Sequence, residues 1–296
     1  MNWRGDILKF TKMHGAGNDY VYLNCMESDV ANKPELARRL SDRHRGVGGD
    51  GLICIAPSST ADFSMEMYNA DGSRAEMCGN GIRCVGKYVY DRGLTDKTEI
   101  NIETLAGIKT LWLNVDEKDG SVNSVRVDMG SPEFRPEMIP MRSDRGDFIN
   151  QAIMVDDRWY EITALSVGNP HAVIFVGDVS TAPVAEIGPK IENHPLFPER
   201  VNVEFVEVTS HENLKMRVWE RGSGETQACG TGATASLVAA ALNGHTGDSA
   251  RVSLTGGKLF IEWDRNANRL YMTGPAVTVF DGELTDFQGN AVQRTP

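Results

Sequence analysis

Short runs of alternating hydrophobic and polar residues cover most of the chain, and this pattern predicts strands. The predicted strands occupy residues 7–10, 20–23, 52–56, 63–68, 98–104, 108–115, 122–128, 160–167, 172–176, 201–208, 215–219 and 276–284. Helical patterns occupy residues 34–40, 78–92, 184–192 and 232–242, and Asn32 is a suitable N-cap for the first of them. The chain is therefore expected to build sheets with a small number of helices.

The predicted helix at 232–242 differs from a surface helix because it carries no charged residue on any face. A helix that is apolar all round is buried. We expect the strands of its own domain to wrap around it.

An offset of 151 residues relates two parts of the chain. It takes Asn18 to Asn169 and Cys78 to Cys229, each within a similar local motif. We interpret this spacing as a duplicated unit, in which a pseudo-twofold axis would bring the two cysteines face to face across a cleft. The turn at Gly130-Ser131-Pro132 and the proline-containing stretch to Pro140 predict the boundary between the copies. The expected domains are residues 1–130, joined by a returning segment 276–296, and residues 131–275.

Each of these cysteines stands directly before a glycine-containing turn that opens a helical segment, in Cys78-Gly79-Asn80-Gly81 and Cys229-Gly230-Thr231-Gly232. Free N–H groups at a helix N-terminus favour a thiolate and bind anions. We therefore expect a lowered thiol pKa and a carboxylate site beside the sulfur atoms. A thiolate and a thiol on opposite sides of a carbon atom are suited to removing and returning a proton.

Composition excludes several classes of protein. The chain has 296 residues, 41% of them hydrophobic and 24% charged, as in a soluble globular protein of two domains. Its net charge of −11 argues against nucleic acid or an anionic membrane as partner. Five cysteines without metal-ligand spacing predict neither a disulfide framework nor a metal site. The N-terminal residues lack the apolar core of a signal peptide, so we expect a cytoplasmic protein.

Several longer motifs resemble those of the diaminopimelate epimerase family, essentially from end to end of the chain. The motifs are Lys12-Met13-His14-Gly15-Ala16-Gly17-Asn18-Asp19, Asn69-Ala70-Asp71-Gly72-Ser73, Cys78-Gly79-Asn80-Gly81, Gly168-Asn169-Pro170-His171 and the run from Glu220 to Gly232. The resemblance implies an α+β fold with two pseudo-symmetric domains, each a rolled, mostly antiparallel sheet around a central helix. It implies cofactor-independent interconversion of LL- and meso-diaminopimelate, in lysine and cell-wall precursor synthesis, and a possible homodimer.

The resemblance also assigns roles to individual residues. It makes Cys78 and Cys229 the acid/base pair, with His171 and Glu220 adjusting the protonation of the thiols. The resemblance makes Arg221 the residue that binds the distal carboxylate of the substrate. It assigns binding of the rest of the substrate to the side-chain amides of Asn18, Asn69, Asn169 and Asn202. Binding of the reacting carboxylate is assigned to Gly79, Asn80, Gly230 and Thr231.

Gly51 departs from the family pattern, because some members have glutamine at this place. We retain it as a weak substrate-binding candidate. Residues 46–51 also match the G-x-G-x-x-G dinucleotide fingerprint. That fingerprint must follow a strand and open a helix, and here the predicted order is reversed, so we do not expect a nucleotide site.

Two other functions are compatible with these residues. A proline or hydroxyproline racemase would share the two-thiol chemistry, but proline has no second carboxylate for Arg221 to bind. A thiol redox or ligand-binding protein without turnover is the second alternative. We expect Cys25, Cys54 and Cys84 to be inert and buried.

Overall fold

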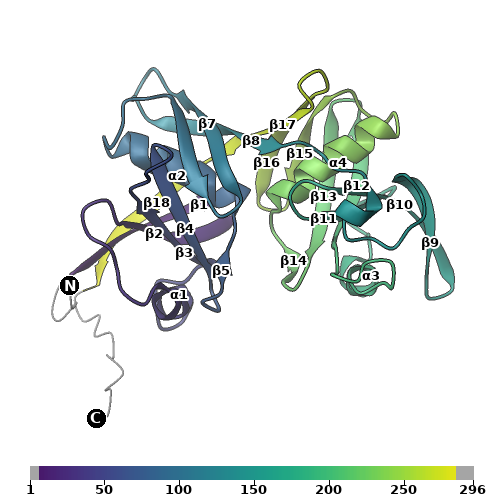
Figure 1. Ribbon diagram of the computed structural model, residues 1–296, viewed down its shortest axis with the longest axis horizontal. Helices are drawn as coiled ribbons and strands as arrows, with labels where there is room; N and C mark the ends of the chain where they lie inside the picture. The colour runs from purple at the N-terminus through teal and green to yellow at the C-terminus, as the bar shows by residue number, and fades with distance from the viewer. Residues whose placement is uncertain (1–6, 285–296) are drawn as a thin grey trace, which may run out of the picture.

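The computed structural model describes residues 7–284 and has the predicted α+β fold. Figure 1 shows two lobes side by side, one containing helix α2 and the other helix α4. Helix α2 comprises Gly79–Asp91 and helix α4 comprises Gly230–Leu242. Each is enclosed by the strands of its lobe, and two shorter helices, α1 (Lys33–Ser41) and α3 (Val184–Glu192), lie on the outside.

Within residues 7–284, the first lobe contains nine strands. They are β1 (Leu8–Gly15), β2 (Asn18–Asn24), β3 (Gly51–Ala56), β4 (Phe63–Asn69), β5 (Arg74–Ala75), β6 (Glu99–Thr104), β7 (Gly107–Val115), β8 (Val122–Gly130) and β18 (Val277–Leu284). Most neighbouring strands are antiparallel, whereas the pairs β2–β3 and β4–β6 are parallel. Strand β18 pairs with β1, so the end of the described chain lies against its beginning.

The second lobe repeats this plan. Its strands are β9 (Phe148–Val155), β10 (Arg158–Ser166), β11 (Pro170–Phe175), β12 (Asn202–Ser210), β13 (Asn213–Glu220), β14 (Gly224–Thr226), β15 (Ser249–Leu254), β16 (Gly257–Asp264) and β17 (Arg269–Pro275). The parallel pairs are β11–β12 and β13–β15, at the places that correspond to those of the first lobe. A short 3-10 helix, Pro136–Met138, precedes β9. Strands β8 and β17 pair with each other and join the lobes.

The residue offset found in the sequence recurs in the strand register. Tyr20 is opposite Gly51 between β2 and β3, and His171 is opposite Asn202 between β11 and β12. Each residue of the second pair follows its counterpart by 151 positions. The two lobes are therefore structural copies of each other.

The largest hydrophobic core surrounds both α2 and α4 and continues from one lobe into the other. Smaller cores lie beneath α1 and α3. Helix α4 is buried along most of its length, as its uncharged sequence predicts. This continuous core holds the N-termini of the two central helices in a fixed relation.

Some local predictions are wrong. The loop expected between residues 14 and 19 is only a two-residue turn, because Ala16 and Gly17 adopt positive φ angles of 53° and 84° and join β1 directly to β2. Asn32 precedes α1 with a φ of 52°, and its side chain makes no capping hydrogen bond. Strands β9, β15, β16 and β17 were not predicted from the pattern, although β15–β17 stand where the repeat would place copies of β6–β8.

No helix within residues 7–284 is long and apolar enough to cross a membrane. The predicted returning segment is described only as far as Leu284, and residues 285–296 lie outside the described part of the chain.

Candidate active site

The two cysteines of the repeated motif occupy the N-cap positions of the two central helices. Cys78 has extended backbone angles, and its sulfur accepts a hydrogen bond from the N–H of Gly81 at 3.4 Å. Cys229 has the same conformation, and its sulfur accepts from the N–H of Gly232 at 3.3 Å. Each sulfur takes the place of the oxygen atom of an ordinary N-cap side chain. Both thiols are therefore held where the free amides of a helix point.

Both cysteines line one cavity of about 1010 Å³ with walls from both lobes. Ten of the predicted site residues contribute to this wall: Asn18, Asn69, Cys78, Gly79, Asn80, Asn169, Glu220, Cys229, Gly230 and Thr231. They come from the ends of β2, β4 and β13, from the β10–β11 turn and from the two helix starts. The fold thus gathers residues distant in sequence around a single space.

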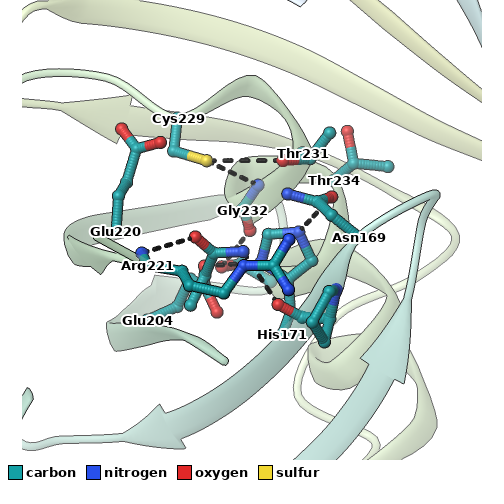
Figure 2. A network of polar contacts seen from close by, with 12 residues as sticks. Asn169, His171, Glu204, Glu220, Arg221, Cys229, Thr231, Gly232 and Thr234 are labelled. Atoms are coloured by element: carbon teal, nitrogen blue, oxygen red, sulfur yellow. Dashed lines mark hydrogen bonds and ion pairs between the residues drawn. The ribbon is translucent and has the colours of Figure 1, made fainter. Parts of the chain in front are cut away.

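The other four predicted site residues do not line this cavity. His171 is fully buried, with one ring nitrogen 2.9 Å from Asn169 Oδ1 and the other 2.7 Å from Glu204 Oε1 (Figure 2). Asn202 accepts a hydrogen bond from the backbone N–H of Arg221 at 2.9 Å. The Arg221 side chain donates to the carbonyl of Glu199 at 3.1 Å. His171 and Asn202 therefore support residues of the site without bordering the cavity.

Gly51, the fourth of these residues, has a packing role. A Cβ atom at this position would stand 2.1 Å from the carbonyl oxygen of Tyr68 and 2.9 Å from Cε1 of Tyr20. A glutamine cannot occupy this backbone without displacing β4. The Tyr20 ring fills the space beside Gly51.

The predicted lowering of the thiol pKa is wrong for both cysteines. Burial raises the pKa of Cys78, and the N–H groups of Gly81 and Asn80 and the side chain of Tyr20 offset only part of this effect. Burial raises the pKa of Cys229 well above its usual range, and the nearby carboxylates of Glu220 and Glu204 add to it. The helix amides replace only a fraction of the solvation that a thiolate has in water.

The surroundings of the two sulfur atoms differ in charge. Cys229 is near two carboxylates, Glu220 and Glu204, and Figure 2 shows Glu220 beside the sulfur. Burial raises the pKa of Glu220, whereas hydrogen bonds from Thr226 and Cys229 lower it in part. Cys78 instead donates to Asn18 Oδ1 at 3.1 Å. The environment of Cys229 therefore favours the thiol form more strongly than that of Cys78.

Three residues that support the site were not predicted from the sequence. Glu204 is fully buried, and its Oε2 atom has no hydrogen-bond partner among the described residues. Asp50 Oδ2 accepts from the Asn18 amide at 2.7 Å and so orients the side chain that contacts Cys78. Tyr20 is the counterpart of His171 at the repeat offset. A signal existed for Glu204, because it is a charged residue within the apolar run Val203–Val206.

Replacement of Tyr20 by phenylalanine is expected to make Cys78 harder to deprotonate. The Tyr20 hydroxyl lowers the pKa of Cys78 by hydrogen bonding, so its loss raises that pKa. The pH profile of Cys78 alkylation, followed by peptide mass spectrometry, is expected to move upward by about half a pH unit or more. Tyr88→Phe is the matched control, because Tyr88 lines a different cavity. An unchanged profile in Tyr20→Phe would contradict this role.

Comparison with protein families gives a match over most of the chain. A profile of the family described as Diaminopimelate epimerase matches residues 10–135 and 163–279. The diaminopimelate epimerase of Acetivibrio thermocellus is 58% identical over 277 residues, which cover 94% of this chain and 98% of that protein. The diaminopimelate epimerase of Methanococcus maripaludis strain C5 is 53% identical over 277 residues, covering 94% of this chain and 99% of that protein.

Solved structures with much lower identity share the fold. A Bacillus anthracis phenazine biosynthesis protein of the PhzF family superposes with a TM-score of 0.68 at 16% identity, covering 94% of this chain and 99% of that one. A hydroxyproline epimerase from Agrobacterium vitis, solved with bound trans-4-hydroxy-L-proline, superposes with a TM-score of 0.66 at 16% identity. The match covers 96% of this chain and 92% of that one. At this identity the likeness concerns architecture alone.

Proposed function

Because the chain belongs to the diaminopimelate epimerase family, we propose that it interconverts LL- and meso-diaminopimelate without a cofactor. The observation that carries this proposal is the pair of N-cap cysteines, one from each lobe, on the wall of one cavity. In the reaction one thiolate removes the α-proton. The thiol on the opposite face donates its proton to the carbanion, so that the two sulfur atoms exchange protonation states.

The two helix N-termini support binding of the reacting carboxylate. The backbone N–H groups of the first residues of α2 and α4 have no partner within the helix, and Gly79, Asn80, Gly230 and Thr231 line the cavity. Such donors bind an anion and stabilise the charge that develops when the α-carbon loses its proton. Asn18, Asn69 and Asn169 line the same cavity and supply amides for the rest of the substrate.

Of the two thiols, we propose that Cys229 keeps its proton to the higher pH. The pKa of Cys229 is raised well above its usual range by burial and by Glu220 and Glu204. Burial raises the pKa of Cys78 as well, but it has hydrogen-bond donors in Gly81, Asn80 and Tyr20. Glu220 receives a hydrogen bond from the Cys229 thiol and keeps that proton in place. His171 and Glu204 act behind Asn169 as a buried support.

Arg221 is the proposed ligand of the distal carboxylate, and it distinguishes diaminopimelate from proline. Its side chain contacts the carbonyl of Glu199, outside the wall of the cavity. The loop between β13 and β14 that carries it must therefore shift when substrate binds. A proline or hydroxyproline racemase is the alternative within the fold, and the hydroxyproline epimerase shares the architecture at only 16% identity.

Deuterium incorporation tests the proposal against both alternatives. In deuterated water, the protein is expected to place solvent deuterium on the α-carbon of LL-diaminopimelate and to form the meso isomer. Deuterium appearing on the α-carbon of L-proline would instead favour a proline racemase. A protein that binds diaminopimelate, as measured by calorimetry, but labels neither amino acid would contradict an epimerase.

We also propose that two copies associate through the β18 edge. Within the described residues β18 pairs only with β1, and it exposes Val277, Val279 and Phe280. An exposed apolar edge strand is usually covered by another element or another chain. Light scattering after size exclusion is expected to give the mass of a dimer, and Val279→Lys is expected to shift it to that of a monomer.

We propose that residues 1–130 and 276–296 form one domain and that residues 131–275 form the other. The β8–β17 pair that joins the lobes is the proposed hinge between them. The proposed location is the cytoplasm, because the reaction depends on reduced thiols.

A further inference from the structure

Arg83 is a charged residue for which the proposed mechanism has so far given no role. It lies in the second turn of α2, five residues after Cys78, and its side chain is completely buried. A buried guanidinium is usually paired with a carboxylate, because burying an unpaired charge costs several kcal/mol. No ion pair to Arg83 is found among residues 7–284, and its hydrogen-bond partners there are neutral.

The guanidinium lies where the starts of α2 and α4 meet. Its Nη1 donates to the carbonyl of Gly79 at 3.0 Å, and its Nη2 donates to Asn80 Oδ1 at 2.9 Å. A Cβ atom on Gly79 would be 2.8 Å from Met272 Cε, and one on Gly230 would be 2.9 Å from Met272 Sδ. Arg83 also lies against Met272, with Nη1 3.6 Å from its sulfur. Both helix starts therefore pack on Met272, which Arg83 also contacts.

The hydrogen bond from Arg83 decides how the Asn80 amide is turned. Because Asn80 Oδ1 accepts from Arg83, its Nδ2 faces the other lobe and donates to the carbonyl of Ala228 at 3.3 Å. Ala228 is the residue directly before Cys229. Arg83 thus acts through Asn80 on the segment that carries the second thiol.

Two glycines, Gly15 and Gly274, leave room for the Arg83 side chain. A Cβ atom on Gly15 would stand 2.9 Å from Arg83 Nη2, and one on Gly274 would stand 3.0 Å from its Cζ. The counterpart of Arg83 at the repeat offset is Thr234, whose hydroxyl donates to the carbonyl of Gly230 at 2.9 Å. The second lobe thus satisfies the equivalent carbonyl with a neutral group. Packing alone therefore does not require a cation at this place in the repeat.

We propose that Arg83 is a positioning residue of the epimerase: it fixes the Asn80 amide between the two helix starts and places a permanent positive charge beneath the substrate's α-carboxylate. This inference rests on the proposed carboxylate site. The carboxylate that binds at the two N-termini supplies the anion that the guanidinium lacks. The charge helps most when the α-carbon loses its proton and the carboxylate becomes more negative.

The charged and titratable groups around this site come from several elements. Cys78, Cys84 and Tyr22 raise the pKa of Arg83, and burial lowers it more. Cys78 is itself influenced by Tyr20 and Glu220. An arginine remains charged in such surroundings at neutral pH. The positive charge of Arg83 stabilises the Cys78 thiolate, so its removal is expected to raise the pH at which Cys78 is alkylated.

Arg83→Gln and Arg83→Lys separate charge from shape. We expect Arg83→Gln to lower kcat about 100-fold with a change in KM of less than about tenfold, and to raise the midpoint of Cys78 alkylation by about one pH unit. Arg83→Lys keeps the charge and is expected to retain at least about a tenth of kcat, with an alkylation midpoint near that of the wild type. Arg92→Gln, at the far end of α2, is the control for the change in net charge.

The contrary outcomes are distinct. A folded Arg83→Gln variant with kcat near that of the wild type, or with the same alkylation profile, would overturn the proposal. If Arg83→Gln does not fold, the test rests on Arg83→Lys. A folded Arg83→Lys variant with kcat below about a tenth of the wild-type value would overturn the proposal. Alkylation of Cys78 needs no turnover, so failure of this inference can be told apart from failure of the proposed epimerase activity.

Discussion

Replacement of either cavity cysteine by alanine is expected to abolish epimerisation while the protein stays folded. Inversion needs a base on one face of the α-carbon and an acid on the other, and in the proposed mechanism each sulfur supplies one of them. Both side chains lie at helix starts on the cavity wall. We expect the rate of LL to meso conversion to fall by at least about 10⁴-fold in Cys78→Ala and in Cys229→Ala.

The single cysteine left in each variant offers a second measurement. It can still remove and return a proton on its own face, so one stereoisomer of diaminopimelate can exchange its α-hydrogen with solvent without inversion. Cys84→Ala is the matched control, because Cys84 is buried within α2 and does not line the cavity. Inversion at an undiminished rate in either cavity variant, with thermal unfolding unchanged, would contradict the two-base route.

Replacement of Glu220 by glutamine is expected to narrow the pH range of activity from the alkaline side. The negative charge of Glu220 raises the pKa of Cys229, so its removal lowers that pKa. Cys229 then loses its proton at a lower pH, and the acid required on that face is absent. We expect the alkaline limb of kcat/KM to move down by about one pH unit and activity at pH 8 to fall by about tenfold.

The two thiols are expected to respond unequally to this change. Glu220 is the second largest influence on the pKa of Cys229 after burial, but only a minor one for Cys78. Alkylation of Cys229 is therefore expected to move to lower pH more than that of Cys78. Glu225→Gln is the control, because Glu225 borders the same cavity but pairs with Arg217 at 2.7 Å. Equal shifts in both variants would show that general charge, and not Glu220, is responsible.

The repeat made much of this architecture predictable. Two cysteines at one offset, each before a glycine turn, are sufficient to infer two helix starts facing a common space, and the strand registers follow the same offset. Strands β15–β17 were missed although their buried and exposed residues alternate regularly, their charged residues lie on the exposed face, and the repeat itself implied them. The turn at Ala16 and Gly17 was taken for a loop because its polar neighbours belong to the strands on either side.

The sequence alone was enough to predict that Cys78 and Cys229 stand at the starts of two helices, because the N-cap position follows from a local pattern of cysteine and glycine. Local patterns carry no information on burial by distant segments, and burial reverses the expected direction of both thiol pKa values. For the same reason the sequence did not reveal that Glu204 lies near Cys229, that the Tyr20 side chain lowers the pKa of Cys78, or that Arg83 is buried where the helices meet with no ion pair among residues 7–284. These properties depend on which strands pack together, and solvation and Coulomb energies are set only by that arrangement.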